Sequence, residues 1–186
     1  MSQDHIVIVG MARTPMGGLM GELSHLSAPE LGAIAVKAAM SEAKAEGADQ
    51  IIMGNVLSAG LGQAPARQAA LKAGLAHSTE AVTLNKMCGS GLQAVAMARQ
   101  ALLAGEANIV IAGGMESMSR APFLMPSHRA GRKYGHDKLL DHMAFDGLED
   151  AYEGQAMGVY ADQSAKEYQF TRTQQDDYAL NTLSRA

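Results

Sequence analysis

The stretch AVTLNKMCGSGLQAVAMARQALLAG, residues 81–105, predicts a strand, a sharp turn and a helix in immediate succession. Val82 to Asn85 is a short run rich in β-branched and aliphatic residues, which is typical of a strand. From Leu92 onwards apolar residues recur at helical spacing, and Gly105 is a typical residue for the end of that helix. Cys88 therefore falls in the turn, just before the N-terminus of the predicted helix.

Cys88 is the only cysteine in the chain, and its position favours a reactive thiol. Unpaired backbone N–H groups and the positive end of the helix dipole stabilise a thiolate at a helix N-terminus. We expect Gly89 and Gly91 to allow the tight turn and to let an acyl group come close to main-chain donors. A single cysteine is more often a small buried apolar residue. The bracketing glycines at a strand-to-helix switch favour a nucleophile instead.

The first 118 residues alternate between predicted strands and helices. Ser27 and Glu30 have the spacing of a capping box at the start of a helix, with Pro29 in its first turn. Such alternation predicts an α/β fold, with a mostly parallel mixed sheet and helices on both faces. Active sites in these sheets gather at the carboxyl ends of the strands, where Cys88 lies. Strands are predicted over residues 6–9, 51–57, 82–85 and 108–112, and a further helix over 64–72.

Residues 119–186 have a different texture and form a predicted second, loop-rich domain. Prolines and glycines interrupt residues 120–146, whereas helices are predicted over 157–168 and from 172 onwards. A long irregular stretch is usually functional or an interaction element. This one contains a basic cluster, which is either a solvated surface or such an element. Its members are His128, Arg129, Arg132, Lys133, His136 and Lys138.

Composition excludes several function classes. The net charge is -4 and no basic stripe is visible, so we expect no nucleic-acid partner. No apolar run approaches the ~20 residues of a membrane span. Residues 1–5 lack the features of a signal peptide, and one cysteine suits a reducing compartment, so we expect a cytoplasmic protein. The six histidines show no metal-ligand spacing and no dinucleotide motif is present, so no metal or cofactor is expected.

Residues 85–94, NKMCGSGLQA, resemble the nucleophile signature of the thiolases, N-x-x-C-G-S-G-x-x-A. Four further motifs resemble thiolase sequence in the right order: ARTP at 12–15, GQAPARQ at 62–68, GGMESMS at 113–119 and DGL at 146–148. The resemblance runs through essentially all 186 residues. A whole thiolase subunit is longer by a complete C-terminal domain, which is absent here, so the chain is similar to the first half of one.

The resemblance implies a two-step acyl transfer on coenzyme A thioesters. Cys88 would attack the thioester of an acyl-CoA, and the α-carbon of a second thioester would then attack the acyl-enzyme. Run backwards, the same steps cleave a 3-ketoacyl-CoA. In thiolases a histidine and a second cysteine from the C-terminal half serve as the bases. The resemblance therefore implies that residues 1–186 alone are catalytically incomplete.

The remaining expectations concern substrate and assembly. Leu148 and Met157 match positions that line the acyl and pantetheine pocket in the family, and either could also be ordinary core. Ala156 stands where enzymes that form acetoacetyl-CoA often carry a histidine. We favour an acetyl-CoA acetyltransferase, with a longer-chain 3-ketoacyl-CoA thiolase as the alternative. The resemblance also implies a homodimer or homotetramer, the latter joined through the basic cluster.

Two interpretations from other classes stay open at this stage. One is a non-catalytic fragment or one half of a split enzyme, which the length of the chain suggests. The other is an unrelated cysteine hydrolase, since Cys88 could attack an ester or amide, although spacing alone assigns it no partner histidine.

Overall fold

The computed structural model describes residues 6–185, so the expectation drawn from residues 1–5 lies outside the described part. The chain divides into two compact units, Met1–Met143 and Ala144–Ala186. The domain boundary expected at residue 118 stays a prediction about the complete protein. The elements of the first unit are α1 (Ala28–Ala43), β1 (Gln50–Gly54), α2 (Pro65–Ala73), β2 (Glu80–Leu84), α3 (Ser90–Ala104), β3 (Val110–Gly114), η1 (Met118–Arg120), β4 (Phe123–Leu124), η2 (His128–Ala130) and β5 (Leu140–Asp141).

A parallel sheet in the order β2-β1-β3 forms the centre of the first unit. Ile52 of the middle strand is level with Val82 on one side and Ala112 on the other. The predicted strands over 51–57, 82–85 and 108–112 are confirmed with shifted ends, because β1 stops at Gly54 and β3 continues to Gly114. The α/β prediction is therefore confirmed.

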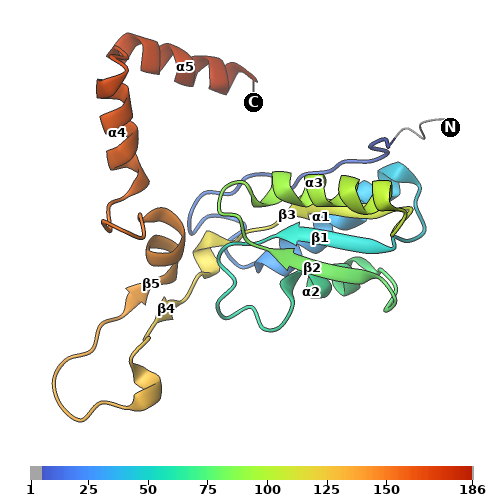
Figure 1. The fold of residues 1–186 in the computed structure, drawn as a ribbon, viewed down its shortest axis with the longest axis horizontal. Coiled ribbons are helices and arrows are strands. Elements are labelled where there is room, and N and C mark those ends of the chain that lie inside the picture. Colours follow the sequence, from blue (N-terminus) through green and yellow to red (C-terminus); the bar gives the residue numbers. More distant parts are fainter. Residues whose placement is uncertain (1–5, 186) are drawn as a thin grey trace. The chain divides into compact units, whose positions relative to one another are not determined.

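Helices cover both faces of this sheet, as the alternation predicts (Figure 1). Ile51 and Met53 point to the face that α1 and α2 cover, and they join a core with Val36 and Ala69. Ile52 points to the opposite face, where α3 packs through two buried alanines, Ala94 and Ala98. The alternation of side chains along β1 thus divides the core into two layers.

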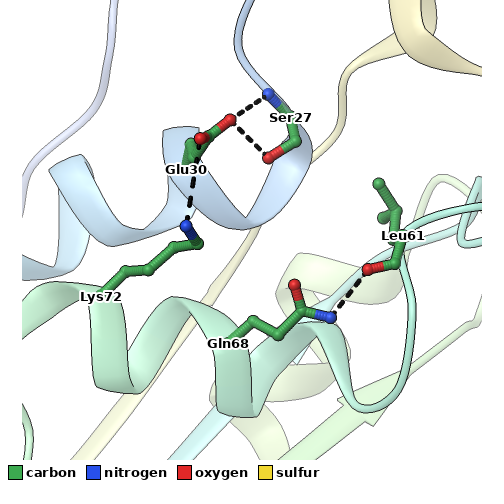
Figure 2. A network of polar contacts seen from close by, with 5 residues as sticks. All are labelled: Ser27, Glu30, Leu61, Gln68 and Lys72. Carbon is green, nitrogen blue, oxygen red and sulfur yellow. Dashed lines mark hydrogen bonds and ion pairs between the residues drawn. The ribbon is translucent and has the colours of Figure 1, made fainter.

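The start of α1 has the polar contacts that its sequence predicts. The Ser27 N–H and hydroxyl both donate to Glu30 Oε2, at 2.8 and 2.7 Å. Because the Ser27 hydroxyl and then its N–H bond the carboxylate, the pKa of Glu30 is lowered. Figure 2 shows the same carboxylate facing Lys72 of α2, with Lys72 Nζ 3.9 Å from Glu30 Oε1, so the capping residue also links the two helices. Nearby, Gln68 Nε2 donates to the Leu61 carbonyl at 2.8 Å and ties α2 to the loop before it (Figure 2).

The strand predicted over residues 6–9 is wrong. These four residues are between 40% and 80% exposed and pair with no strand in the described chain. In the described chain, no further strand pairs with the outer edges of β2 and β3. The chain instead follows α1, where Gly10 packs against Ala39 and the Met11 N–H donates to Glu42 Oε2 at 2.7 Å. An apolar run indicates that burial of the segment is favourable, but it does not show that a partner strand is available.

The loop-rich segment predicted after residue 119 is confirmed in outline. Its regular parts within the first unit are short: two-residue β4 and β5 pair antiparallel, with Phe123 level with Asp141. The second unit consists of the π-helix η3 (Ala144–Leu148), α4 (Met157–Glu167) and α5 (Arg172–Arg185). Thr171 caps α5 as predicted, because its Oγ1 accepts the Gln174 N–H at 3.2 Å and its N–H donates to Gln174 Oε1 at 2.8 Å.

Candidate active site

Cys88 lies in a short elbow between β2 and α3, as the sequence predicts. β2 ends at Leu84, α3 begins at Ser90, and the thiol between them is exposed. The elbow stands at the carboxyl ends of all three strands. There the Asn55 N–H donates to the Leu84 carbonyl at 3.0 Å, which fixes the end of β2 against the end of β1.

The backbone strain of the elbow is at Met87, and the glycines carry none of it. Met87 has φ 48°, a left-handed conformation that is unfavourable for a side chain with a Cβ. Gly89 has φ -86°, an ordinary value, so the expectation that the glycines provide the turn is wrong. The Met87 N–H donates to Asn85 Oδ1 at 2.9 Å, which helps to hold the strained residue. Met87 carried no sequence signal that marks it as strained.

Ser90 is a second residue of the elbow that the sequence did not single out. Its side chain is buried, and its Oγ accepts from the Lys86 N–H at 2.8 Å while donating to the Met87 carbonyl at 2.6 Å. The hydroxyl therefore closes the turn that carries Cys88. The only signal available in the sequence was a small polar residue at the first position of a helix, where such side chains often bond nearby backbone.

The first turn of α3, which follows Cys88 in the chain, contains hydrogen-bond donors without acceptors in the described chain. The first α-helical bond runs from the Gln93 N–H to the Gly89 carbonyl at 2.9 Å. Ahead of it, the N–H groups of Gly91 and Leu92 have no acceptor among the residues that the structure describes. Such groups favour a negative charge at the helix N-terminus. An exposed thiol that precedes a helix start with free N–H donors is an arrangement suited to attack on a carbonyl carbon.

A carboxylate joins the ends of β1 and β3 beneath the elbow. Glu116 accepts from the Val56 N–H at 2.8 Å and from the Leu57 N–H at 3.0 Å. It also accepts from Asn55 Nδ2 at 2.8 Å. Glu116 belongs to the GGMESMS motif, and its structural role was not foreseen, because its partners lie about sixty positions earlier in the chain.

Leu148 and Met157, the two predicted substrate contacts, lie in the second unit, whereas Cys88 lies in the first. A bridge between Glu149 and Ala156 closes the loop that separates them, so both flank the same bridge. Their side chains are 42% and 47% exposed. Leu148 and Met157 thus lie on either side of one bridge, and both side chains are exposed rather than part of a core.

Residues 6–186 match a family model described as the thiolase N-terminal domain. The chain belongs to the thiolase family. An acetyl-CoA acetyltransferase of Cupriavidus necator is 50% identical over 183 residues, which cover 97% of this chain and 47% of the relative. One of Saccharomyces cerevisiae is 48% identical over 190 residues, covering 100% of this chain and 48% of the relative. Acetyl-CoA acetyltransferase 2 of Arabidopsis thaliana is 50% identical over 182 residues, covering 97% and 45% respectively. The chain spans about half the length of the curated relatives it matches.

The basic cluster of this thiolase chain is partly neutralised within its own loop. Arg132 Nη1 lies 2.8 Å from Asp137 Oδ1, and the Ser127 hydroxyl donates to the same oxygen at 2.7 Å. The Ser127 hydroxyl and the Lys138 N–H lower the pKa of Asp137, which keeps this carboxylate charged beside the arginine. Arg129 and Lys133 are exposed and have no ion-pair partner in the described chain.

The described part of the thiolase chain contains no metal cluster and no membrane-spanning helix. Over residues 6–185, no group of three or more His, Cys, Asp or Glu side chains is placed to hold a metal ion. Over the same residues, no helix combines the length and the apolar character needed to cross a membrane.

Proposed function

We propose that this chain is the nucleophile-bearing half of an acetyl-CoA acetyltransferase, with Cys88 as the residue that carries the acyl group. The observation that carries this proposal is the exposed thiol of Cys88, which lies at the N-terminus of α3 within the thiolase signature. The relatives that are about half identical to the chain are named acetyl-CoA acetyltransferases, which favours acetyl-CoA as the substrate.

In the first step, the Cys88 sulfur forms a bond to the carbonyl carbon of acetyl-CoA. The bond between that carbon and the coenzyme A sulfur breaks, and coenzyme A leaves with the proton that the Cys88 thiol has lost. The carbonyl oxygen carries negative charge between these events, and the free N–H groups of Gly91 and Leu92 are donors near the nucleophile that can stabilise it.

In the second step, a second acetyl-CoA loses an α-proton to a base and its α-carbon attacks the acetyl group on Cys88. The bond to the Cys88 sulfur breaks, the thiol regains a proton, and acetoacetyl-CoA is released. The resemblance assigns the bases of both steps to the half that is outside these residues. Each base is worth roughly 10²- to 10⁴-fold in rate.

Leu148 and Met157 are proposed to contact the acyl group and the pantetheine arm. Their support is that both are open and flank one bridge, so a ligand can touch them together. A longer-chain 3-ketoacyl-CoA thiolase is the second candidate, and Ala156 beside Met157 is the observation that favours it. The preference of the complete enzyme for acetoacetyl-CoA over a ketoacyl-CoA with a long chain separates the two. An Ala156→His variant that raises this preference would support the role assigned to the pocket.

The proposal for assembly and location draws on composition and on exposed charge. A homodimer or homotetramer that works in the cytoplasm agrees with the single cysteine and with the exposed cations Arg129 and Lys133. Coenzyme A thioesters are the proposed substrates, with no metal or other cofactor, nucleic acid or membrane as partner.

The test is acetylation of Cys88 in the complete enzyme. With labelled acetyl-CoA, we expect the label on the peptide that contains Cys88, and we expect prior acetyl-CoA to slow alkylation of this thiol by iodoacetamide. A Cys88→Ser variant should form no acyl-enzyme, because the helix N-terminus alone does not activate an alcohol. Label on another residue, or equal labelling of the serine variant, would overturn the proposal. A complete enzyme that takes no label at all would favour the non-catalytic alternative.

A further inference from the structure

We infer that Ser90 is the positioning residue of Cys88: its hydroxyl holds Met87 in the left-handed conformation that presents the thiol at the start of α3. This inference rests on the proposed role of Cys88 as nucleophile. It assigns to the serine of the signature a task that differs from contact with substrate. Ser90 is 5% exposed, so its side chain is directed into the protein.

The hydroxyl of Ser90 bonds both residues that precede the nucleophile. Ser90 Oγ accepts from the Lys86 N–H at 2.8 Å and donates to the Met87 carbonyl at 2.6 Å. The Ser90 N–H donates to the same carbonyl at 3.0 Å. The Ser90 hydroxyl therefore fixes the peptide group that follows Met87 and the one that precedes Lys86, so one side chain spans both residues. Water cannot easily replace a buried hydroxyl in this task.

The conformation that these bonds hold is one that Met87 would otherwise leave. A non-glycine residue at φ 48° persists only where its surroundings determine it. Asn85 Oδ1 accepts the Met87 N–H at 2.9 Å, and the Gly89 N–H donates to the Lys86 carbonyl at 3.1 Å. Both bonds hold the peptide group before Met87, whereas the Ser90 side chain bonds the carbonyl after it. Without the Ser90 hydroxyl, we expect Met87 to return to negative φ, which rotates the following residue, Cys88, away from its place.

Ser90 can act as a fixed point because its backbone is seated on the sheet. A Cβ built on Gly54, the last residue of β1, would lie 2.6 Å from Ser90 Cβ and 2.9 Å from the Ser90 carbonyl carbon. The helix start thus rests directly on the end of the central strand, with no side chain between them. The contact transmits the position of β1 through Ser90 to Met87 and so to Cys88.

The experiment compares Ser90→Ala with a variant that removes the strain. In the complete enzyme, Ser90→Ala should lower the rate of Cys88 acetylation, and in the 186-residue chain its rate of iodoacetamide alkylation, by about ten- to a hundredfold. Glycine accepts positive φ without cost, so Met87→Gly in the Ser90→Ala background should restore most of both rates. Alkylation in urea, where all variants should react alike, provides the reference rate.

Ser117→Ala is the matched control, because the Ser117 hydroxyl donates to the Leu26 carbonyl at 2.7 Å in the same unit but outside the elbow. Melting temperatures of all variants separate lost stability from lost positioning. We expect the control to lose a similar amount of stability and to keep its Cys88 rates. Should Ser90→Ala fail to fold, the double variant with Met87→Gly carries the test, and normal rates in it support the inference.

Three results would overturn the inference: unchanged rates in folded Ser90→Ala, no rescue by Met87→Gly, or an equal fall in the Ser117→Ala control. The proposed function fails differently. If the unaltered complete enzyme takes no acetyl group on Cys88 while alkylation still depends on Ser90, then the positioning role holds and the nucleophile role does not.

Discussion

Asn55 Nδ2 lies 2.8 Å from Glu116 Oε1, and this contact fastens the end of β1 to the end of β3. The same carboxylate accepts the N–H groups of Val56 and Leu57, so one side chain satisfies three donors where the chain leaves the sheet. A backbone bond also links the two strand ends, because the Met115 N–H donates to the Gly54 carbonyl at 2.9 Å. The platform under the Cys88 elbow is thus held by polar contacts as well as by core packing.

Glu116→Gln should destabilise the first unit by about 1–3 kcal/mol, the usual cost of leaving a partly buried donor without an acceptor. The new amide group must face at least one N–H donor that the carboxylate now accepts. Urea unfolding followed by circular dichroism measures the change. Glu106→Gln is the control, because Glu106 is exposed, and it should leave the midpoint in place. Equal midpoints for both variants would contradict the role assigned to Glu116.

Local features of this fold follow from sequence, whereas features that depend on distant partners do not. The Ser27 and Glu30 contacts are three residues apart, so spacing alone predicts them. The place of Cys88 between a strand and a helix is equally local. The segment over 6–9 has the composition of a buried strand, but the chain after it is held to α1 by the bond from the Met11 N–H to Glu42 Oε2, a partner 31 positions away.

The elbow also combines features that local sequence predicts with features that depend on tertiary contacts. Motif spacing locates Cys88, and the glycines suggest which residues bend. Met87 adopts the left-handed conformation because two contacts determine its backbone conformation. One is the bond from the Ser90 hydroxyl to the Met87 carbonyl, and the other is the close approach of Ser90 to Gly54. These contacts involve a side chain and a strand end that no periodicity reveals. Leu148 and Met157 came from resemblance alone, and their role remains a proposal.

Stability should fall in acid partly through Asp49. Its carboxylate accepts the N–H groups of Asn108 at 2.7 Å and of Ile109 at 3.1 Å, and these bonds, the Asn108 bond first, lower the pKa of Asp49. A carboxyl whose pKa is lower in the folded state stabilises the fold above its unfolded pKa. That stabilisation is lost as the pH falls through the folded value, below the ordinary 3.8.

At neutral pH, Asp49→Asn should therefore lower the urea midpoint of unfolding. Below about pH 4, the midpoint of this variant should fall less steeply with decreasing pH than that of the unaltered chain. Asp162→Asn, at an exposed position, provides the control and should leave the pH profile unchanged. A profile for Asp49→Asn that keeps the full acid slope would show that other carboxyl groups account for it.

Gly54→Ala should disturb the nucleophile through packing alone. Its new Cβ would meet Ser90 Cβ at 2.6 Å, so α3 must move away from the sheet. We expect a loss of about 1–3 kcal/mol in the free energy of unfolding, as for other overpacked sites, and a slower alkylation of Cys88. Gly47→Ala is the matched control, since nothing lies within 4 Å of the added Cβ. Wild-type alkylation in a stable Gly54→Ala variant would argue against the close seat of α3.

The basic cluster makes a prediction about assembly of the complete protein. Arg129 and Lys133 are exposed, whereas Arg132 is engaged by Asp137 at 2.8 Å. Arg129→Glu combined with Lys133→Glu should weaken a tetramer but leave dimers intact, as sedimentation velocity can measure. Lys166→Glu, on α4, controls for a general change of charge. A tetramer that survives the double change would identify the cluster as a solvated surface.

The 186 residues alone should not turn over acetyl-CoA or acetoacetyl-CoA above background. Acid-base groups are each commonly worth roughly 10²- to 10⁴-fold, and the resemblance places at least two of them outside these residues. Slow acetylation of Cys88 is still expected, because the free N–H donors of α3 belong to this half. The measurement is release of coenzyme A from acetyl-CoA, by the chain alone and mixed with a separately expressed C-terminal half. Cys88→Ser in each mixture is the control.

The outcomes of that assay separate the remaining interpretations. Turnover only on mixing, and only with Cys88 present, would identify a site that two halves complete. No release of coenzyme A in either condition would favour a chain that keeps the family fold without catalysis. Turnover by the chain alone that depends on Cys88 would contradict the prediction, because a base within these residues, such as His128 or His142, would then have to serve the nucleophile. His142 is buried and its Nε2 accepts the Ala59 N–H at 3.3 Å, so that role would require it to give up a structural contact.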